Sequence, residues 1–221
     1  MKRRKSRFRR RVQLYTRLGC VILIGVFLVF GAMKLLNIGP FSNQYKENTG
    51  DDMDAARPQI QVELLTVNEY SRPTIEVGKI KGIVIHYTAN PGSTAMQNRD
   101  YFEGLKETKE TMASSHFIVG IEGEIVQCVP TWEIAYASNN RNADTISIET
   151  CHLTEDGTYT EETYDSLVDL TAWLCKKFDL TEEDLIRHYD ITGKICPKYF
   201  VENEDAWDDF KKDVAKAIDC I

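Results

Sequence analysis

Short blocks of apolar residues predict several β-strands in the middle of the chain. Residues 80–87, IKGIVIHY, have the β-branched composition of a buried strand that ends at His86. Residues 116–129 alternate between apolar and polar positions in two halves around a Glu-Gly pair, which predicts a hairpin. Residues 146–151 predict a further strand.

Helical spacing of apolar residues dominates other segments. Ser93 is placed to cap a helix over residues 93–105, and residues 181–184 resemble the start of a short helix. Residues 160–178 and 204–218 repeat apolar side chains at helical spacing, namely Leu167, Leu170, Leu174, Phe178, Trp207, Phe210, Val214 and Ile218. This order of strands and helices predicts an α/β domain with a small central mixed β-sheet flanked by helices.

The beginning of the chain has a different pattern. Residues 1–17 hold nine of the 27 lysines and arginines and no carboxylate. Residues 18–33 are uncharged and strongly apolar, and two leucines after Lys34 extend the run toward the roughly 20 residues that span a membrane. We therefore expect one N-terminal transmembrane helix, a signal-anchor, over residues 18–36.

The position of the basic residues predicts the orientation of this segment. Lysine and arginine are enriched on the cytoplasmic side of membrane helices, so residues 1–17 should form a cytoplasmic arm and the rest should be exported. A cleaved signal peptide, which would give a secreted protein, is the alternative, although no A-x-A site follows the apolar run. Charge-directed topology explains the arm more simply than nucleic-acid binding does, so we expect no nucleic-acid partner.

The exported part divides into a linker and a domain. Residues 37–60 are polar, are rich in Gly, Asn and Asp, and lack an apolar period, so they predict a stalk. Residues 61–221 then form one domain, which we expect to be monomeric. Residues 18–221 carry all 34 acidic residues and only 18 of the 27 basic ones, and this contrast with the arm supports the predicted topology.

The cysteines add a constraint on this domain. Five follow the apolar segment, namely Cys128, Cys151, Cys175, Cys196 and Cys220. An odd number in an oxidising compartment implies at least one thiol that is free, bound to a metal or paired between chains. Cys196 is the candidate for the metal-bound thiol, and the pairing of the others stays open.

Histidines near this cysteine suggest a metal site. The chain has four histidines, and one of them, His188, precedes Cys196 by eight residues in a loop-like stretch broken by Gly193 and Pro197. Neutral imidazole and thiolate are preferred zinc ligands, and a catalytic zinc site uses three protein ligands and one open position. A histidine at a strand end, a distant histidine and a cysteine can supply such a set, but spacing alone does not establish it.

Four sequence blocks carry a resemblance to a known family: IVIHYTAN (83–90), SSHFIVGIEGEIVQCVP (114–130), IAYASNNRNADTISIETC (134–151) and RHYDITGKICP (187–197). In this order they resemble the amidase type 2 family, the N-acetylmuramoyl-L-alanine amidases, which share a fold with phage lysozyme-type amidases and peptidoglycan recognition proteins. The resemblance covers roughly residues 78–219. It implies an enzyme that cuts peptidoglycan between N-acetylmuramic acid and the first alanine of the stem peptide.

The resemblance also implies roles for single residues. The family's zinc ligands fall on His86, His188 and Cys196. Glu149 matches the strand glutamate that takes a proton from water and passes it to the leaving nitrogen, which is chemistry suited to a carboxylate beside a metal. Lys194 matches a basic residue that would stabilise the negative charge on the carbonyl oxygen, although an exposed loop lysine is the alternative.

Two departures from the family pattern bear on the rate. Some members carry a tyrosine where this chain has Ser115, and some carry a histidine where it has Ala137. Proton transfer should therefore depend mainly on Glu149. The other two histidines, His116 and His152, match no ligand motif, so we expect them to be packed or supporting residues.

Residues next to these motifs are candidates for binding the substrate, namely Tyr87, Thr88, Ser138, Asn139 and Arg141. The expected partner is peptidoglycan or its muropeptide fragments. A non-catalytic muropeptide-binding module of the same fold is the alternative function. The presence of all the implied ligands together with Glu149 favours catalysis.

Overall fold

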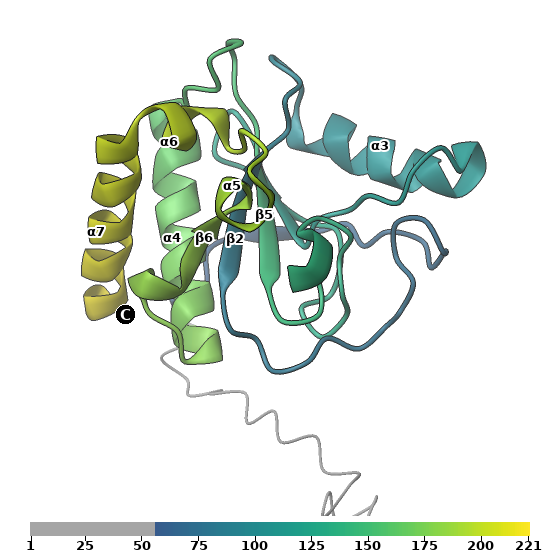
Figure 1. Cartoon of the computed structure of the whole chain (residues 1–221), viewed down its shortest axis with the longest axis horizontal. Helices are drawn as coiled ribbons and strands as arrows, with labels where there is room; N and C mark the ends of the chain where they lie inside the picture. The colour runs from purple at the N-terminus through teal and green to yellow at the C-terminus, as the bar shows by residue number, and fades with distance from the viewer. Residues whose placement is uncertain (1–55) are drawn as a thin grey trace, which may run out of the picture. The chain divides into compact units, whose positions relative to one another are not determined.

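Residues 56–221 are described by the computed structural model, and six strands in them form one mixed sheet (Figure 1). The strands are β1 (Ile60–Val62), β2 (Ile83–Tyr87), β3 (Phe117–Val119), β4 (Ile125–Gln127), β5 (Ile146–Thr150) and β6 (Leu185–Arg187). They lie in the order β1-β4-β3-β5-β2-β6. Only β3 and β4 pair antiparallel, as a hairpin, and the other neighbours are parallel.

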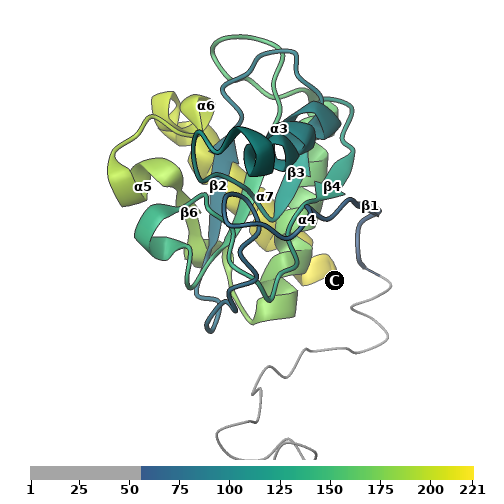
Figure 2. The same ribbon diagram turned by 90° about the vertical axis from the view of Figure 1, so that its right-hand side faces the viewer.

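Three longer helices flank this sheet. They are α3 (Ala95–Thr108), α4 (Glu161–Phe178) and α7 (Glu204–Cys220). Shorter helical turns are η2 (Asn139–Arg141), η3 (Glu182–Asp184), α5 (His188–Thr192) and α6 (Lys198–Glu202). In Figures 1 and 2, α4 and α7 lie side by side on one face of the sheet, and α3 lies on the other face.

Alternation along the strands gives each face its own core. On β2, Ile83 and Ile85 point toward α4 and α7 and join the larger apolar cluster, together with Leu167 and Phe210. The other face packs Ile118 and its neighbours against α3 in a second cluster. His86 lies on this second face, at the end of a strand whose Ile83 and Ile85 are anchored in the larger cluster.

The predicted architecture is confirmed for this part of the chain. The mixed sheet, the hairpin with Gly123 at φ +82°, and the helices predicted over residues 160–178 and 204–218 are all present. The start of α3 was predicted one residue too early. Thr94, not Ser93, accepts the hydrogen bond from Gln97 N, because Ser93 donates its hydroxyl to Asn90 O instead.

Other elements were not predicted. The edge strands β1 and β6 have three residues each, and α5 and α6 have five, too short for a recognisable apolar period. None of the helices within residues 56–221 is long and apolar enough to cross a membrane. The predicted cytoplasmic arm (1–17), membrane segment (18–36) and most of the stalk lie outside the described residues.

Candidate metal centre

The carboxyl ends of three parallel strands meet at the candidate site. His86 on β2 pairs in register with Glu149 on β5, so the two side chains lie on the same face. On the other side of β2, β6 ends at Arg187 and His188 follows at once. Ligands of α/β proteins commonly bind outside the carboxyl ends of such strands. Thr150 connects the ends of β5 and β2, because its hydroxyl donates to His86 O at 2.7 Å.

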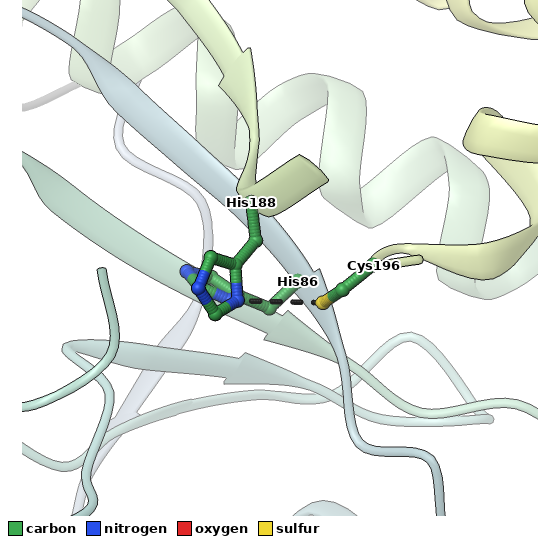
Figure 3. A group of neighbouring side chains, drawn as sticks. All are labelled: His86, His188 and Cys196. Atoms are coloured by element: carbon green, nitrogen blue, oxygen red, sulfur yellow. Dashed lines mark hydrogen bonds between the residues drawn. The ribbon is translucent and has the colours of Figure 1, made fainter. Parts of the chain in front are cut away.

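A closed loop returns the chain from His188 to Cys196. His188 begins the short helix α5, where the sequence predicted an irregular loop, and the helix ends at Gly193. Gly193 has φ +76°, a conformation that favours glycine and stops the helix. The Tyr189 backbone N–H then donates to Cys196 O at 2.9 Å. This bond brings the thiol back beside the two imidazoles (Figure 3).

The three implied ligands form one compact group. His86, His188 and Cys196 are buried, and one donor atom from each lies within 4.8 Å of the others. His86 Nδ1 lies 3.8 Å from Cys196 Sγ, and the two imidazole centroids are 4.7 Å apart (Figure 3). Because zinc binds nitrogen and sulfur at about 2.0 to 2.3 Å, small movements would bring all three donors onto one ion.

The outer nitrogen of each imidazole already has a partner. His86 Nε2 lies 3.2 Å from Ser138 Oγ, and His188 Nε2 lies 2.9 Å from Asn139 Oδ1. Both Nδ1 atoms are therefore left for a shared ligand with Cys196 Sγ. The sequence placed Ser138 and Asn139 among the substrate contacts, whereas here they touch the histidines.

Burial keeps both imidazoles neutral. The pKa of His86 lies well below its ordinary value because of burial and the nearby charges of His188 and Lys194. Burial and Lys194 also lower the pKa of His188. Burial raises the pKa of Cys196 to about 12, with a further increase from Glu149 and opposing effects from the Tyr87 backbone N–H and Lys194. A bound dication would favour the thiolate, because the metal's charge reverses this preference.

Glu149 presents a carboxylate with a buried, unpaired oxygen. Within residues 56–221, its Oε2 is buried and accepts no hydrogen bond. Burial raises the pKa of Glu149 to about 8, and the charge of Lys194 opposes this shift. Burial of a carboxylate oxygen without a partner is destabilising, and this one lies on the strand next to His86, so Glu149 is a candidate for chemistry at the ligand group.

Lys194 is exposed and lies in the loop between His188 and Cys196. Its charge lowers the pKa of His86, His188, Cys196 and Glu149. The Lys194 ammonium therefore lies close enough to act on the charge of all four groups. The structure thus brings five of the predicted residues into one constellation.

Comparison with known proteins identifies the relatives of this chain. The family model described as N-acetylmuramoyl-L-alanine amidase matches residues 76–199, more than half of the chain. The chain belongs to this amidase family. It is 37% identical over 161 residues to the N-acetylmuramoyl-L-alanine amidase CwlL of Bacillus licheniformis, and 34% identical over 171 residues to BlyA of Bacillus subtilis. These matches cover 67% and 68% of this chain but only 44% and 45% of the relatives, so the chain spans less than half of their length.

Solved structures show the same amidase-family fold. A mutant endolysin from Bacillus subtilis is 26% identical, with a TM-score of 0.59, and the match covers 71% of this chain and 98% of that one. The solution structure of the PlyG catalytic domain has a TM-score of 0.61 at 24% identity, covering 73% and 96%. The helix-flanked mixed sheet is therefore common to this chain and these proteins.

The remaining predicted substrate residues lie in different places. Tyr87 alternates to the opposite face from His86, and its ring stacks on His152 at 5.2 Å. Thr88 follows directly, and its hydroxyl oxygen is buried without a hydrogen-bond partner in the described part of the chain. Arg141 does not join the group of His86, His188 and Cys196. It pairs with Asp144 at 2.7 Å, beside the start of β2.

The other two histidines have structural partners, as expected. His116 accepts from Ser147 N at 3.0 Å through Nδ1, and its Nε2 lies 2.9 Å from Glu133 O, so neither nitrogen is available to a metal. His152 places Nδ1 2.8 Å from Thr154 O. Both are buried and neither joins the ligand group.

The five cysteines of the described region are all free, and four of them are buried. Burial raises the pKa of Cys151 and of Cys175 to about 12, and the pKa of Cys128 higher still. The raised pKa values keep these three side chains as thiols, and the thiolate is the reactive form. They therefore behave as small apolar core residues. None of the five forms a disulfide within residues 56–221, and Cys196 remains the candidate metal ligand.

Proposed function

We propose that the chain is a zinc-dependent hydrolase that cleaves the amide between N-acetylmuramic acid and L-alanine in peptidoglycan. One observation carries the proposal: His86, His188 and Cys196 converge beside the unpaired carboxylate of Glu149 in a chain of the amidase family. A buried carboxylate next to three such ligands suits hydrolysis.

The residues present fit zinc. Two neutral imidazoles and one thiol are a preferred zinc donor set, and three protein ligands leave a fourth position for water or substrate. His86 and His188 would bind through Nδ1, because their Nε2 atoms contact Ser138 and Asn139. When bound, zinc lowers the pKa of a coordinated water toward neutrality and polarises the scissile carbonyl.

Glu149 is proposed as the general base and then the general acid. Its carboxylate takes a proton from the attacking water as the new C–O bond forms at the muramyl lactyl carbonyl. It then gives that proton to the alanine nitrogen as the C–N bond breaks, which leaves a free amine and a free carboxylate. A pKa of about 8 without metal falls when a cation binds nearby, so the carboxylate is ionised for the first step.

Lys194 is proposed to stabilise negative charge on the carbonyl oxygen in the transition state. Its exposed position in the loop lets the ammonium reach a substrate that lies across the ligand group. Two apolar neighbours of the ligands, Tyr189 and Ile195, are 41% and 51% exposed on the same loop. We propose that they contact the stem peptide or the sugar ring.

The proposed location is the outer side of the cell membrane. The apolar segment 18–36 would anchor the protein with residues 1–17 in the cytoplasm, and residues 37–60 would connect it to the catalytic domain 61–221. Secretion after cleavage of the segment is the alternative. Both alternatives place the domain on the side where peptidoglycan lies.

Incubation of the full-length protein with purified sacculi, with and without a chelator, tests this function. The proposal predicts new free α-amino groups on L-alanine, identified by mass spectrometry, and their loss in the chelated sample. Sacculi that are bound but not cut would favour the alternative, a muropeptide-binding module of the same fold. New termini at any other bond would contradict the assigned linkage.

A further inference from the structure

A single turn contacts both candidate histidine ligands from the side away from Cys196. Ser138 and Asn139, which begin the turn around η2, lie against His86 Nε2 at 3.2 Å and His188 Nε2 at 2.9 Å. The two histidines come from opposite ends of the domain's sequence. Two consecutive residues therefore contact two histidines that lie far apart in the sequence.

The turn itself is held firmly. Asn142 Oδ1 accepts from Ser138 N at 2.6 Å and from Ala137 N at 3.2 Å, which closes the turn on itself. Thr145 donates its hydroxyl to Arg141 O at 2.7 Å and connects the turn to the start of β5. Asn139 has φ +54°, a left-handed conformation that asparagine tolerates better than most residues.

The chemistry of the partners determines which nitrogen carries the proton. A carbonyl oxygen such as Asn139 Oδ1 can only accept, so His188 must donate from Nε2–H. The Ser138 hydroxyl is buried, and it can accept from His86 Nε2–H in the same way. In a neutral imidazole, a proton on Nε2 leaves the lone pair on Nδ1. For His86, this is the atom 3.8 Å from Cys196 Sγ.

We propose that Ser138 and Asn139 are positioning residues that fix the tautomer and the orientation of His86 and His188 before a metal binds. The inference rests on the proposed zinc site and reassigns two residues that sequence alone suggested for substrate binding. Partners of this kind raise metal affinity by about 10- to 100-fold in metalloproteins. The turn acts on the metal site through the histidines and does not touch the reacting atoms.

Side-chain substitutions in the full-length protein test this role. Ser138→Ala and Asn139→Gly each remove one acceptor, and glycine adopts the left-handed φ of residue 139 without strain. Ser138→Thr and Asn139→Asp keep an oxygen acceptor and serve as rescue variants. Asn140→Gly changes an exposed neighbour in the same turn and is the matched control.

Two measurements separate positioning from general damage. Zinc affinity, from competition with a chromogenic chelator, should fall roughly 10- to 100-fold in Ser138→Ala and Asn139→Gly and stay near wild type in the rescue and control variants. Nitrogen-15 NMR of the zinc-free protein at a pH where the histidines are neutral should show Nε2–H tautomers for His86 and His188. Ser138→Ala should change only the first and Asn139→Gly only the second.

The results distinguish this inference from the proposed function. Wild-type tautomers and wild-type zinc affinity in both Ser138→Ala and Asn139→Gly would overturn the positioning role. If one variant does not fold, the other tests the role by itself, because each addresses a different histidine. A protein that shows this pattern of tautomers and zinc affinity but cuts no sacculi would keep the positioning role and remove the proposed hydrolase.

Discussion

Glu149 separates a hydrolase from a binding module at the scale of one residue. Glu149→Gln keeps the shape of the side chain but cannot take up a proton, so kcat should fall by roughly 10² to 10⁴. Zinc content and binding to sacculi should change little. The measurement is the initial rate of amide cleavage, with Glu107→Gln on the exposed surface of α3 as the control. A correctly folded, zinc-loaded Glu149→Gln protein with wild-type rate would remove Glu149 from the mechanism.

The same residue should make the zinc-free protein less stable at high pH. The folded-state pKa of Glu149 is about 8, above the ordinary value of about 4.3, so the fold favours the protonated form. Stability is therefore present below the ordinary pKa and is lost as the pH rises through about 8. Metal-free Glu149→Gln should melt several degrees above wild type at pH 9, and the difference should shrink at pH 5. Equal melting temperatures of wild type and Glu149→Gln at both pH values would show that burial of the carboxylate does not lower the stability of the fold.

Lys194 is predicted to act on the transition state more than on binding. Lys194→Met removes the ammonium but keeps a long side chain, so kcat should fall by roughly 10 to 10³ while KM changes less. Lys79→Met, an exposed lysine before β2, is the matched control. Kinetics on a soluble muropeptide would measure both constants. An unchanged kcat would show that Lys194 is an ordinary exposed loop residue.

The sequence pointed to the candidate site residues but not to the groups that hold them. His86, His188, Cys196 and Glu149 were named from their match to the motifs of the amidase family, because spacing alone left the ligand set open. Ser138 was expected to face the substrate because its motif lies near the site. Its contact with His86 depends on how a turn folds back across the sheet, which no local pattern encodes.

Among the elements, the junction of β6 and α5 is stabilised by several polar contacts of Arg187. Arg187 is buried and pairs with Asp190 at 2.9 Å and with Glu204 at 2.7 Å. It also donates to Phe200 O at 3.1 Å. This guanidinium connects β6, α5, α6 and α7, and His188 is its neighbour in the chain. The position of His188 therefore depends on α6 and α7 as well as on its own strand and helix.

Loss of this guanidinium should destabilise the whole domain. Arg187→Met removes the guanidinium donors to Asp190, Glu204 and the Phe200 carbonyl, and the free energy of unfolding should fall by about 2 to 4 kcal/mol. Zinc affinity should also fall, because His188 loses its support. Urea unfolding followed by circular dichroism measures the first effect. Lys212→Met, which removes an exposed pair with Asp209, is the control and should leave the unfolding midpoint unchanged.

The length of an element determined whether sequence predicted it. The helices α4 and α7 repeat apolar residues over several turns. Strand β2 begins with three consecutive apolar residues and β5 alternates apolar with polar residues, so these patterns are visible in the sequence. The strand β6 has three residues and owes its place to pairing with β2. Long-range pairing of this kind is not encoded by local periodicity, so the strand that delivers His188 was not predicted.

For the whole molecule, the arrangement of charge predicts a protein attached to the membrane. Basic residues precede the apolar segment 18–36, and the chain after it is strongly acidic. Fractionation of cells should leave the full-length protein in the membrane fraction. Protease added from outside should digest the domain but leave residues 1–17 protected. Soluble protein that begins soon after residue 33 would show that the segment is a cleaved signal peptide.

The central claim is that one zinc ion held by His86, His188 and Cys196 is required for amide cleavage. Titration of zinc into the metal-free full-length protein, with release of free alanine amino groups from sacculi as the readout, tests it most directly. The rate should rise linearly and level off at about one zinc per chain, and Cys196→Ala should stay inactive across the same range. Full cleavage by the metal-free protein, or wild-type activation of Cys196→Ala, would contradict the claim.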